Sequence, residues 1–223
     1  MKFEPGPPPK IESTCQVEEP VPEPPNSPPP AAPPPPATPP LPASIYEDLT
    51  QVSFDENGQP LPTSARVTGA NPRTVLVSLK NGRNPHKGAG IFFSMGTNSR
   101  NAGAWGIGAG VPWGCSLFHV WGHYVDICEN GTPPGGGVTL PYDKWHHVGF
   151  TYDGTSIRFY YDGILASTES FSANTVDSEA YYGCYAPGPH GDCFKGTASQ
   201  LRVFDIALDD EQVASFYSLP GPQ

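Results

Sequence analysis

The chain has 223 residues, with 12 Lys and Arg against 22 Asp and Glu, and its formal net charge is −10. No run of Lys or Arg interrupts this acidic composition, so nucleic acid and anionic membrane surfaces are poor partners, and soluble glycans or proteins remain. No apolar run approaches the roughly 18 residues of a spanning helix, and the first ten residues, MKFEPGPPPK, lack the apolar core of a signal peptide.

Residues 1–44 are rich in proline and hold 18 of the 30 prolines of the chain. Proline lacks the backbone N–H and fixes φ, so this segment cannot form a helix or a strand ladder. We expect a disordered polyproline II linker over residues 1–44 and a folded unit over residues 45–223.

The folded part is predicted to be nearly all β, because runs of β-branched and aromatic residues alternate with turn signals from Thr74 onward. The first expected strands, in chain order, are 73–80 (RTVLVSLK), 90–96 (GIFFSMG), 105–110 (WGIGAG) and 117–127 (LFHVWGHYVDI). The last of these is expected to be one long strand with a bulge at Gly122.

A three-stranded meander follows over residues 146–169, where Asp153-Gly154 and Asp162-Gly163 separate three alternating runs. Asp and Gly tolerate the positive φ of type I′ turns, so both pairs predict tight hairpins. The apolar residues of the first two strands alternate, which places two sets on the core face: Val148, Phe150 and Tyr152, then Ile157, Phe159 and Tyr161.

The end of the chain predicts a last strand at 199–206 and a short helix that begins after Asp209. Asp209 suits the N-cap position with Gln212 three residues later, and Pro220 limits the length of the helix. These elements together indicate an all-β fold, a two-sheet antiparallel jelly-roll sandwich with a short C-terminal helix.

Four of the five cysteines form two close pairs, Cys115 with Cys128 and Cys184 with Cys193, and each pair encloses a short loop. Disulfides are one interpretation and free buried thiols are another; a zinc site fits neither spacing well. Cys15 is left over in the proline-rich segment, either free or paired between chains. If the protein is secreted, we expect this chain to be a fragment of a longer one or to be exported without an ordinary signal.

Residues 71–217 resemble the laminin G-like jelly-roll domains of the concanavalin A-like lectin/glucanase superfamily. The resemblance rests on Trp145-His146-His147, on the two Tyr-Asp-Gly triplets at 152–154 and 161–163, and on the ending ALDDEQV. It implies an extracellular, non-catalytic recognition or adhesion module that binds glycans or proteins, in some members with calcium at the rim of the sandwich.

The histidine pair looks at first like a metal or acid/base site. Successive residues of a strand point to opposite faces, so His146 and His147 are expected to diverge: one packs in the sheet with Trp145 and the other faces water. Asp153 and Asp162 are likewise assigned to turn chemistry rather than to calcium.

The stretch YVDICE (124–129) is similar to the E-x-D-x-x-E strand of retaining β-glucanases in the same superfamily. Asp126 and Glu129 match the second and third carboxylates, but Tyr124 stands where the nucleophilic glutamate is required. The protein is therefore not expected to be an enzyme, and a degenerate glycosidase is kept only as an alternative.

Ligand-binding candidates lie among aromatic residues of the Gly-rich region, because sugar rings stack on exposed indole. They are Trp113, Trp105, Trp121, His123 and Tyr124, with Trp113 favoured by its Pro-Trp-Gly setting. No cofactor is expected, although Glu129 and Asp192 are candidate calcium ligands, and Asn130 begins an N-glycosylation triplet.

Three hypotheses follow. The first is a glycan- or glycoprotein-binding module at the cell or particle surface, held away from its neighbour by the proline-rich linker. The second is a structural module of a matrix, wall or particle that uses Cys15 for an intermolecular disulfide. The third is the degenerate glycosidase.

Overall fold

The structure of the protein is a computed structural model that describes residues 40–54, 58–82, 90–96, 104–109, 118–121, 127–128, 140–184, 193–218 and 222. The described residues all belong to one unit, Ala37–Gln223. Of the predicted linker, only Pro40–Ser44 is described, and these five residues have no regular secondary structure.

One sheet has seven strands in the order β1-β13-β4-β9-β10-β11, and β2 pairs with β13 beside that path. Its strands are β1 (Tyr46–Asp48), β2 (Val52–Phe54), β4 (Arg73–Asn81), β9 (Trp145–Tyr152), β10 (Ser156–Tyr161), β11 (Ile164–Ser170) and β13 (Gly196–Phe204). The second sheet has six strands in the order β3-β12-β5-β6-β7-β8. These are β3 (Gln59–Leu61), β5 (Gly90–Gly96), β6 (Ala104–Ala109), β7 (Phe118–Trp121), β8 (Ile127–Cys128) and β12 (Ala180–Tyr182).

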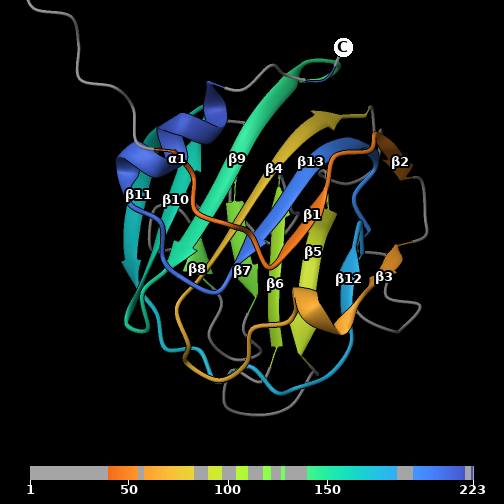
Figure 1. Cartoon of the computed structure of the whole chain (residues 1–223). Helices are drawn as coiled ribbons and strands as arrows, with labels where there is room; N and C mark the ends of the chain where they lie inside the picture. Colours follow the sequence, from red (N-terminus) through yellow and green to blue (C-terminus); the bar gives the residue numbers. More distant parts are fainter. Residues whose placement is uncertain are drawn as a thin grey trace, which may run out of the picture. The chain divides into compact units, whose positions relative to one another are not determined.

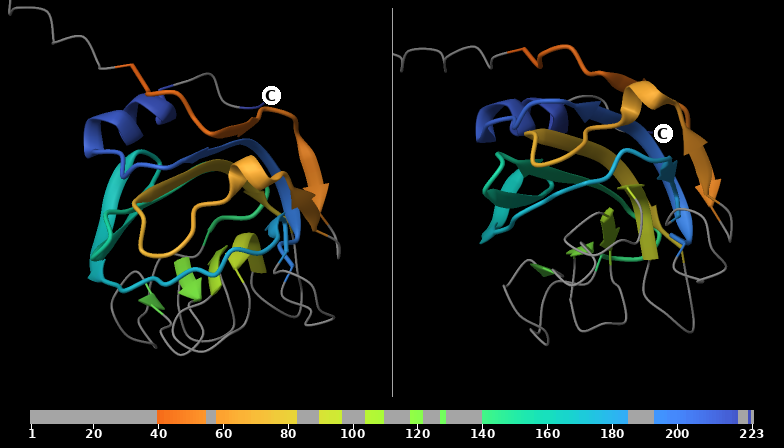
Figure 2. Two further views of the ribbon diagram at one scale, coloured as in Figure 1. Left: turned by 60° about the horizontal axis from the view of Figure 1, so that its bottom comes forward. Right: turned by 90° about the horizontal axis from the view of Figure 1, so that it is seen from below.

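The strands pair antiparallel throughout the two sheets. The sheets lie face to face, and a short 3-10 helix, Thr63–Ala65, lies in the connection between β3 and β4 (Figures 1 and 2). The predicted two-sheet jelly-roll sandwich is confirmed.

The core lies between the sheets, and β9 and β10 supply much of it. Phe150, Tyr152, Ile157 and Phe159 have no solvent exposure, as their alternation in the sequence predicts. The sixth residue of the predicted set, Tyr161, is half-buried and packs against this core.

The C-terminal helix, α1 (Asp210–Tyr217), lies on part of the outer face of the seven-stranded sheet, at the side of β10 and β11 (Figures 1 and 2). Asp209 is its N-cap and forms the predicted capping box with Gln212. A second apolar cluster lies beneath the helix and includes Val213 and Phe216; Leu41 packs against it from the end of the proline-rich segment. Among the described residues, no helix is long and apolar enough to cross a bilayer.

Two local predictions were wrong. Residues 117–127 are not one strand, because β7 and β8 are separate strands that pair antiparallel, His119 with Cys128. Alternation identifies residues that suit a strand, but it does not show that the chain reverses after Trp121, and Gly122 is as compatible with a turn as with a bulge.

Asp153 is the second error, since it does not adopt a positive φ, whereas Asp162 (φ 48°) and Gly163 (φ 78°) form the predicted turn. The connection after β9 is longer, with Tyr152 opposite Ile157. The Asp153 carboxylate there accepts hydrogen bonds from the backbone N–H groups of Thr155 and Ser156, each at 2.8 Å. The turn thus combines an Asx-type arrangement at Asp153 with a positive φ at Gly154 alone (105°).

Arg73 is a fully buried arginine at the start of β4. Its guanidinium donates to the carbonyl oxygens of Val67 (2.8 Å), Gly69 (2.6 Å) and Asn71 (3.0 Å), and to the hydroxyl of Thr175 (2.9 Å). Burial lowers its pKa to about 10, which leaves the group charged at neutral pH. Arg73 thus fixes the segment that precedes β4 from inside the protein.

Candidate functional site

Most of the predicted site residues fall outside the described part of the chain. They are Trp113, His123, Tyr124, Glu129, Asn130 and Asp192, together with Cys15 and Cys115. Trp105, Trp121 and Cys128 lie in β6, β7 and β8, where the strand positions are described and the side chains are not.

The pairing register shows where the segments that carry these residues join the sandwich. Ala109, the last residue of β6, pairs with Gly90 of β5 and with Phe118 of β7, so the segment 110–117 leaves and re-enters the sheet at this end. Cys128 is at the same end, because its partner His119 follows Phe118. The segment that contains Trp113 and the one that begins with Glu129 therefore join the six-stranded sheet at one end.

The Cys184–Cys193 disulfide is at this end as well and confirms one of the two predicted pairs. Cys193 bridges to Ile91, next to Gly90. Gly90 has φ 82°, and a Cβ added there would lie 2.2 Å from the Cys193 carbonyl oxygen, so only glycine fits. The disulfide ties together the two ends of residues 185–192, which carry Asp192.

His123 and Tyr124 are separated from this group by the topology. Their segment, 122–126, joins Trp121 to Ile127, and Trp121 pairs with Gly106, towards the opposite end of the sheet. In the register of the strands, Trp105 is opposite Met95 and Trp121 is opposite Gly106.

The histidine pair diverges, as predicted. His146 lies on the core side of β9, with its Nδ1 2.9 Å from the carboxylate of Asp162 and 2.6 Å from the hydroxyl of Tyr161. Burial is the largest cause that raises the pKa of Tyr161, to about 12, so its hydroxyl stays protonated. The carboxylate accepts the Nδ1–H, and His146 therefore fastens the β10–β11 turn to the start of β9.

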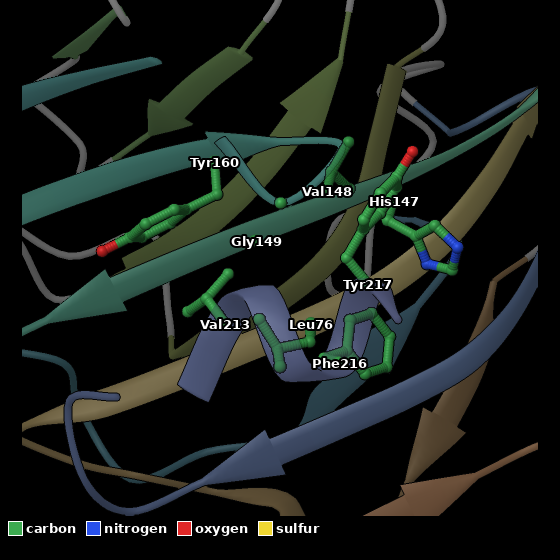
Figure 3. Close-up of a pocket in the computed structure, with 9 residues that line it drawn as sticks. Leu76, His147, Val148, Gly149, Tyr160, Val213, Phe216 and Tyr217 are labelled. Atoms are coloured by element: carbon green, nitrogen blue, oxygen red, sulfur yellow. The ribbon is translucent and has the colours of Figure 1, made fainter. Parts of the chain in front are cut away.

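His147 lies on the outer face, beneath α1, in a pocket with room for about one water molecule (Figure 3). Its Nδ1 is 2.9 Å from the Ser78 hydroxyl, and that hydroxyl donates its only proton to Gln200 Oε1 at 2.7 Å. His147 must therefore donate to Ser78. A base that activates a serine accepts a proton from it, so the direction of this bond does not suit nucleophilic catalysis.

No group of three or more His, Cys, Asp or Glu residues that could hold a metal ion occurs in the part of the chain that the structure describes. The predicted calcium ligands, Glu129 and Asp192, lie outside that part.

A family model described as "Concanavalin A-like lectin/glucanases superfamily" (Laminin_G_3) matches residues 55–214, nearly the whole described sandwich. The chain belongs to the concanavalin A-like lectin/glucanase superfamily. The resemblance seen in the sequence is thereby confirmed. No curated protein matches this superfamily member at a significant level.

Solved structures similar to this superfamily member share its fold at low sequence identity. The CBM40 of a Ruminococcus gnavus IT-sialidase, bound to α2,3-sialyllactose, is 14% identical with TM-score 0.58, and the match covers 79% of this chain and 100% of that one. Domain 4 of AbnA, an extracellular GH43 arabinanase from Geobacillus stearothermophilus, in complex with arabinotriose, is 19% identical with TM-score 0.52, covering 72% of each chain. A SAP-like pentraxin from Limulus polyphemus is 17% identical with TM-score 0.51, covering 77% and 81%.

Proposed function

We propose that this protein is a non-catalytic, extracellular recognition module that binds glycan or glycoprotein. The observation that carries the proposal is the likeness of the sandwich to the complete R. gnavus CBM40, all of which is covered by the match. That module is bound to sialyllactose, and the similar arabinanase domain is in complex with arabinotriose. Superfamily membership over residues 55–214 supports the same class of function.

The binding surface is proposed at the end of the six-stranded sheet where the segments of Trp113, Glu129 and Asp192 join it. Trp113 stacks on a sugar ring in this proposal, and Glu129 and Asp192 are calcium ligands beside it. His123, Tyr124 and Trp121 form a second candidate surface towards the other end. Trp105 is the least suited of the predicted residues, because its register partner Met95 is buried in the core.

The proposal also includes the sequence predictions for the linker, for Cys15, for Asn130 and for the location of the protein. The linker 1–44 would hold the module away from its neighbour, Cys15 would allow an intermolecular disulfide, and Asn130 would carry a glycan. The chain would act outside the cell, where the Cys184–Cys193 disulfide is stable. A structural module of a matrix, wall or particle surface is the second candidate, favoured by the fifth cysteine, Cys15, in the proline-rich segment.

A glycan array probed with the full chain, with calcium and with EDTA, tests the proposal; sialylated and arabinan oligosaccharides belong on it. We expect a dose-dependent signal that Trp113→Ala abolishes. Leu49→Ala is the matched control, since Leu49 is an exposed apolar side chain next to β1 of the other sheet, and it should bind as the wild type does.

If the correctly folded protein binds no glycan on the array, the structural role is favoured. Turnover of a β-glucan panel that disappears in Glu129→Gln would overturn the non-catalytic assignment and favour the glycosidase. Loss of signal with EDTA alone would assign calcium to the site, and an unchanged signal would exclude it.

A further inference from the structure

α1 is fastened to the outer face of the seven-stranded sheet at both of its ends. At the N-terminal end, Asp210 accepts a hydrogen bond from the Tyr160 hydroxyl at 2.7 Å and forms an ion pair with Arg158 at 2.9 Å. At the C-terminal end, Phe216 and Tyr217 pack edge-to-face against the ring of His147, with centroids 5.4 and 5.1 Å apart. Figure 3 shows these rings together beside β9.

The helix lies on backbone in this region and has little space to adjust. A Cβ added at Gly149 would lie 3.5 Å from Val213 Cγ1, and one added at Gly163 would lie 3.0 Å from Tyr217 Cβ. The pocket is lined by His147, by the two tyrosines Tyr160 and Tyr217, and otherwise by apolar residues and glycine. His147 is therefore the one basic side chain in the lining of this pocket. A change in the charge of His147 therefore acts directly on the last turn of α1.

The structure defines where a further proton would go. His147 already donates its Nδ1–H to Ser78, whose own proton is held by Gln200. Gln200 lies at a bulge in β13 and has a positive φ of 56°. A second proton must go to Nε2, the other nitrogen of a ring that lines a pocket with room for about one water molecule.

The charges that face His147 come from each element packed against it. Asp162, in the β10–β11 turn, favours the imidazolium, but its carboxylate is already hydrogen-bonded to His146 and to a backbone N–H. His146, on β9, disfavours it. Arg202 of β13 lies over the ring of Phe216, Lys80 of β4 is the next outward position after Ser78, and α1 contributes the phenol of Tyr217.

Burial is the largest of these influences and lowers the pKa of His147 below its usual value of 6.5. The negative end of the helix dipole stabilises the imidazolium only weakly, because carbonyl oxygens of the last turn already accept a hydrogen bond from the Ser218 N–H. A group whose pKa is lowered on folding stabilises the folded state above its unfolded pKa. This stabilisation declines as the pH falls below about 6.5.

We propose that His147 is an acid-sensitive latch, which holds the last turn of α1 on the sheet when neutral and releases it when protonated. This inference does not depend on glycan binding. It assigns a conformational role to a histidine that the sequence marks only as part of the scaffold.

Backbone amide exchange of the full chain at pH 7.5 and pH 5.0, corrected for intrinsic rates, tests the proposal. The reporters are the amides of the last turn, Phe216 to Ser218, of which the Ser218 N–H donates to the Ala214 carbonyl oxygen. We expect their protection to fall about fivefold at pH 5.0 relative to amides of β4. In His147→Asn, whose amide can still donate to Ser78, the ratio between the two pH values should be close to one.

Two controls separate the latch from a general acid effect. His146→Asn removes the neighbouring histidine on the other face of β9; the response should persist, with its midpoint moved to higher pH because His146 disfavours the imidazolium of His147. Tyr160→Phe removes a non-titrating bond at the other end of α1 and should lower protection equally at both pH values.

Should His147→Asn fail to fold, the NMR titration of the His147 ring in the wild type decides instead, because its midpoint must coincide with that of the exchange transition. Protection of α1 that does not change with pH, or an unchanged response in His147→Asn, would overturn the proposal.

Discussion

Two hydrogen bonds join His147 to Asp162: one links their backbones, and the other links the His147 backbone to the Asp162 side chain. The His147 N–H donates to Asp162 Oδ1 at 2.9 Å, and the Asp162 N–H donates to the His147 carbonyl oxygen at 2.8 Å. The same carboxylate accepts from His146. The aspartate of the hairpin turn therefore also fixes the first residues of β9, which explains why a segment rich in reactive residue types serves as scaffold.

Asp162→Ala should be strongly destabilising, because it removes two charge-assisted hydrogen bonds and puts alanine at φ 48°. We expect a loss of about 2–3 kcal/mol in the free energy of unfolding, measured by urea denaturation, and about 1 kcal/mol for Asp162→Asn, which tolerates this φ. Asp143→Ala is the control, since Asp143 has a similar φ of 58° but is exposed. Equal losses for Asp143→Ala and Asp162→Ala would contradict a role for the carboxylate.

Arg73→Met should lower the free energy of unfolding by about 3–5 kcal/mol, more than any surface substitution. The reason is that three backbone carbonyl oxygens lose their donor in a buried site. Arg73→Lys should recover only part of this loss, since one ammonium cannot reach all the acceptors of a planar guanidinium. Thermal unfolding of both variants checks the prediction. Arg158→Met, at a half-buried arginine, provides the comparison, and a larger effect there would refute the ranking.

The elements that the sequence predicts well are those set by neighbours in the chain. The capping box at Asp209, the turn at Asp162-Gly163 and the alternation of β9 and β10 depend on residues only a few positions apart. The reversal between β7 and β8 was missed because residues 117–127 have the composition of a strand throughout, and no local signal outweighs it.

The contacts made by buried polar groups are beyond sequence reasoning, because they join distant positions. Arg73 binds Thr175, 102 residues later, and Ser78 binds Gln200, 122 residues later. The sequence did show that His146 and His147 face opposite sides, yet the helix that covers His147 comes 63 residues after it. Only the packing of α1 onto β9 turns that histidine into a candidate for pH dependence.

Asp153 should make stability acid-sensitive at its turn. Hydrogen bonds from Ser156 and Thr155 hold the pKa of its carboxyl well below the usual 3.8, so its contribution is present above that pH and is lost as the pH falls further. Because the side chain is mostly exposed, the expected effect is small, and Asp153→Asn should be only slightly less stable than the wild type at pH 7. The difference between the two should shrink as the pH falls below about 4, measured by urea unfolding from pH 7 to pH 2.5. Asp205→Asn, at another exposed aspartate, should follow the wild type, and a gap that widens in acid would contradict the assignment.

Removing the Cys184–Cys193 disulfide should lower stability and also test where the ligand binds. The bridge closes a loop with a sequence separation of 9, for which chain entropy predicts a loss of about 2–3 kcal/mol in the double variant Cys184→Ser, Cys193→Ser. The sandwich should survive, because the Phe194 N–H still donates to the carbonyl oxygens of Ile91 and Gly183. If the proposed binding surface includes the segment that carries Asp192, the folded double variant should bind the array glycan at least about tenfold more weakly, since its ends are no longer held together. Unchanged affinity in the folded variant would move the binding surface away from this disulfide and towards the segment of His123 and Tyr124.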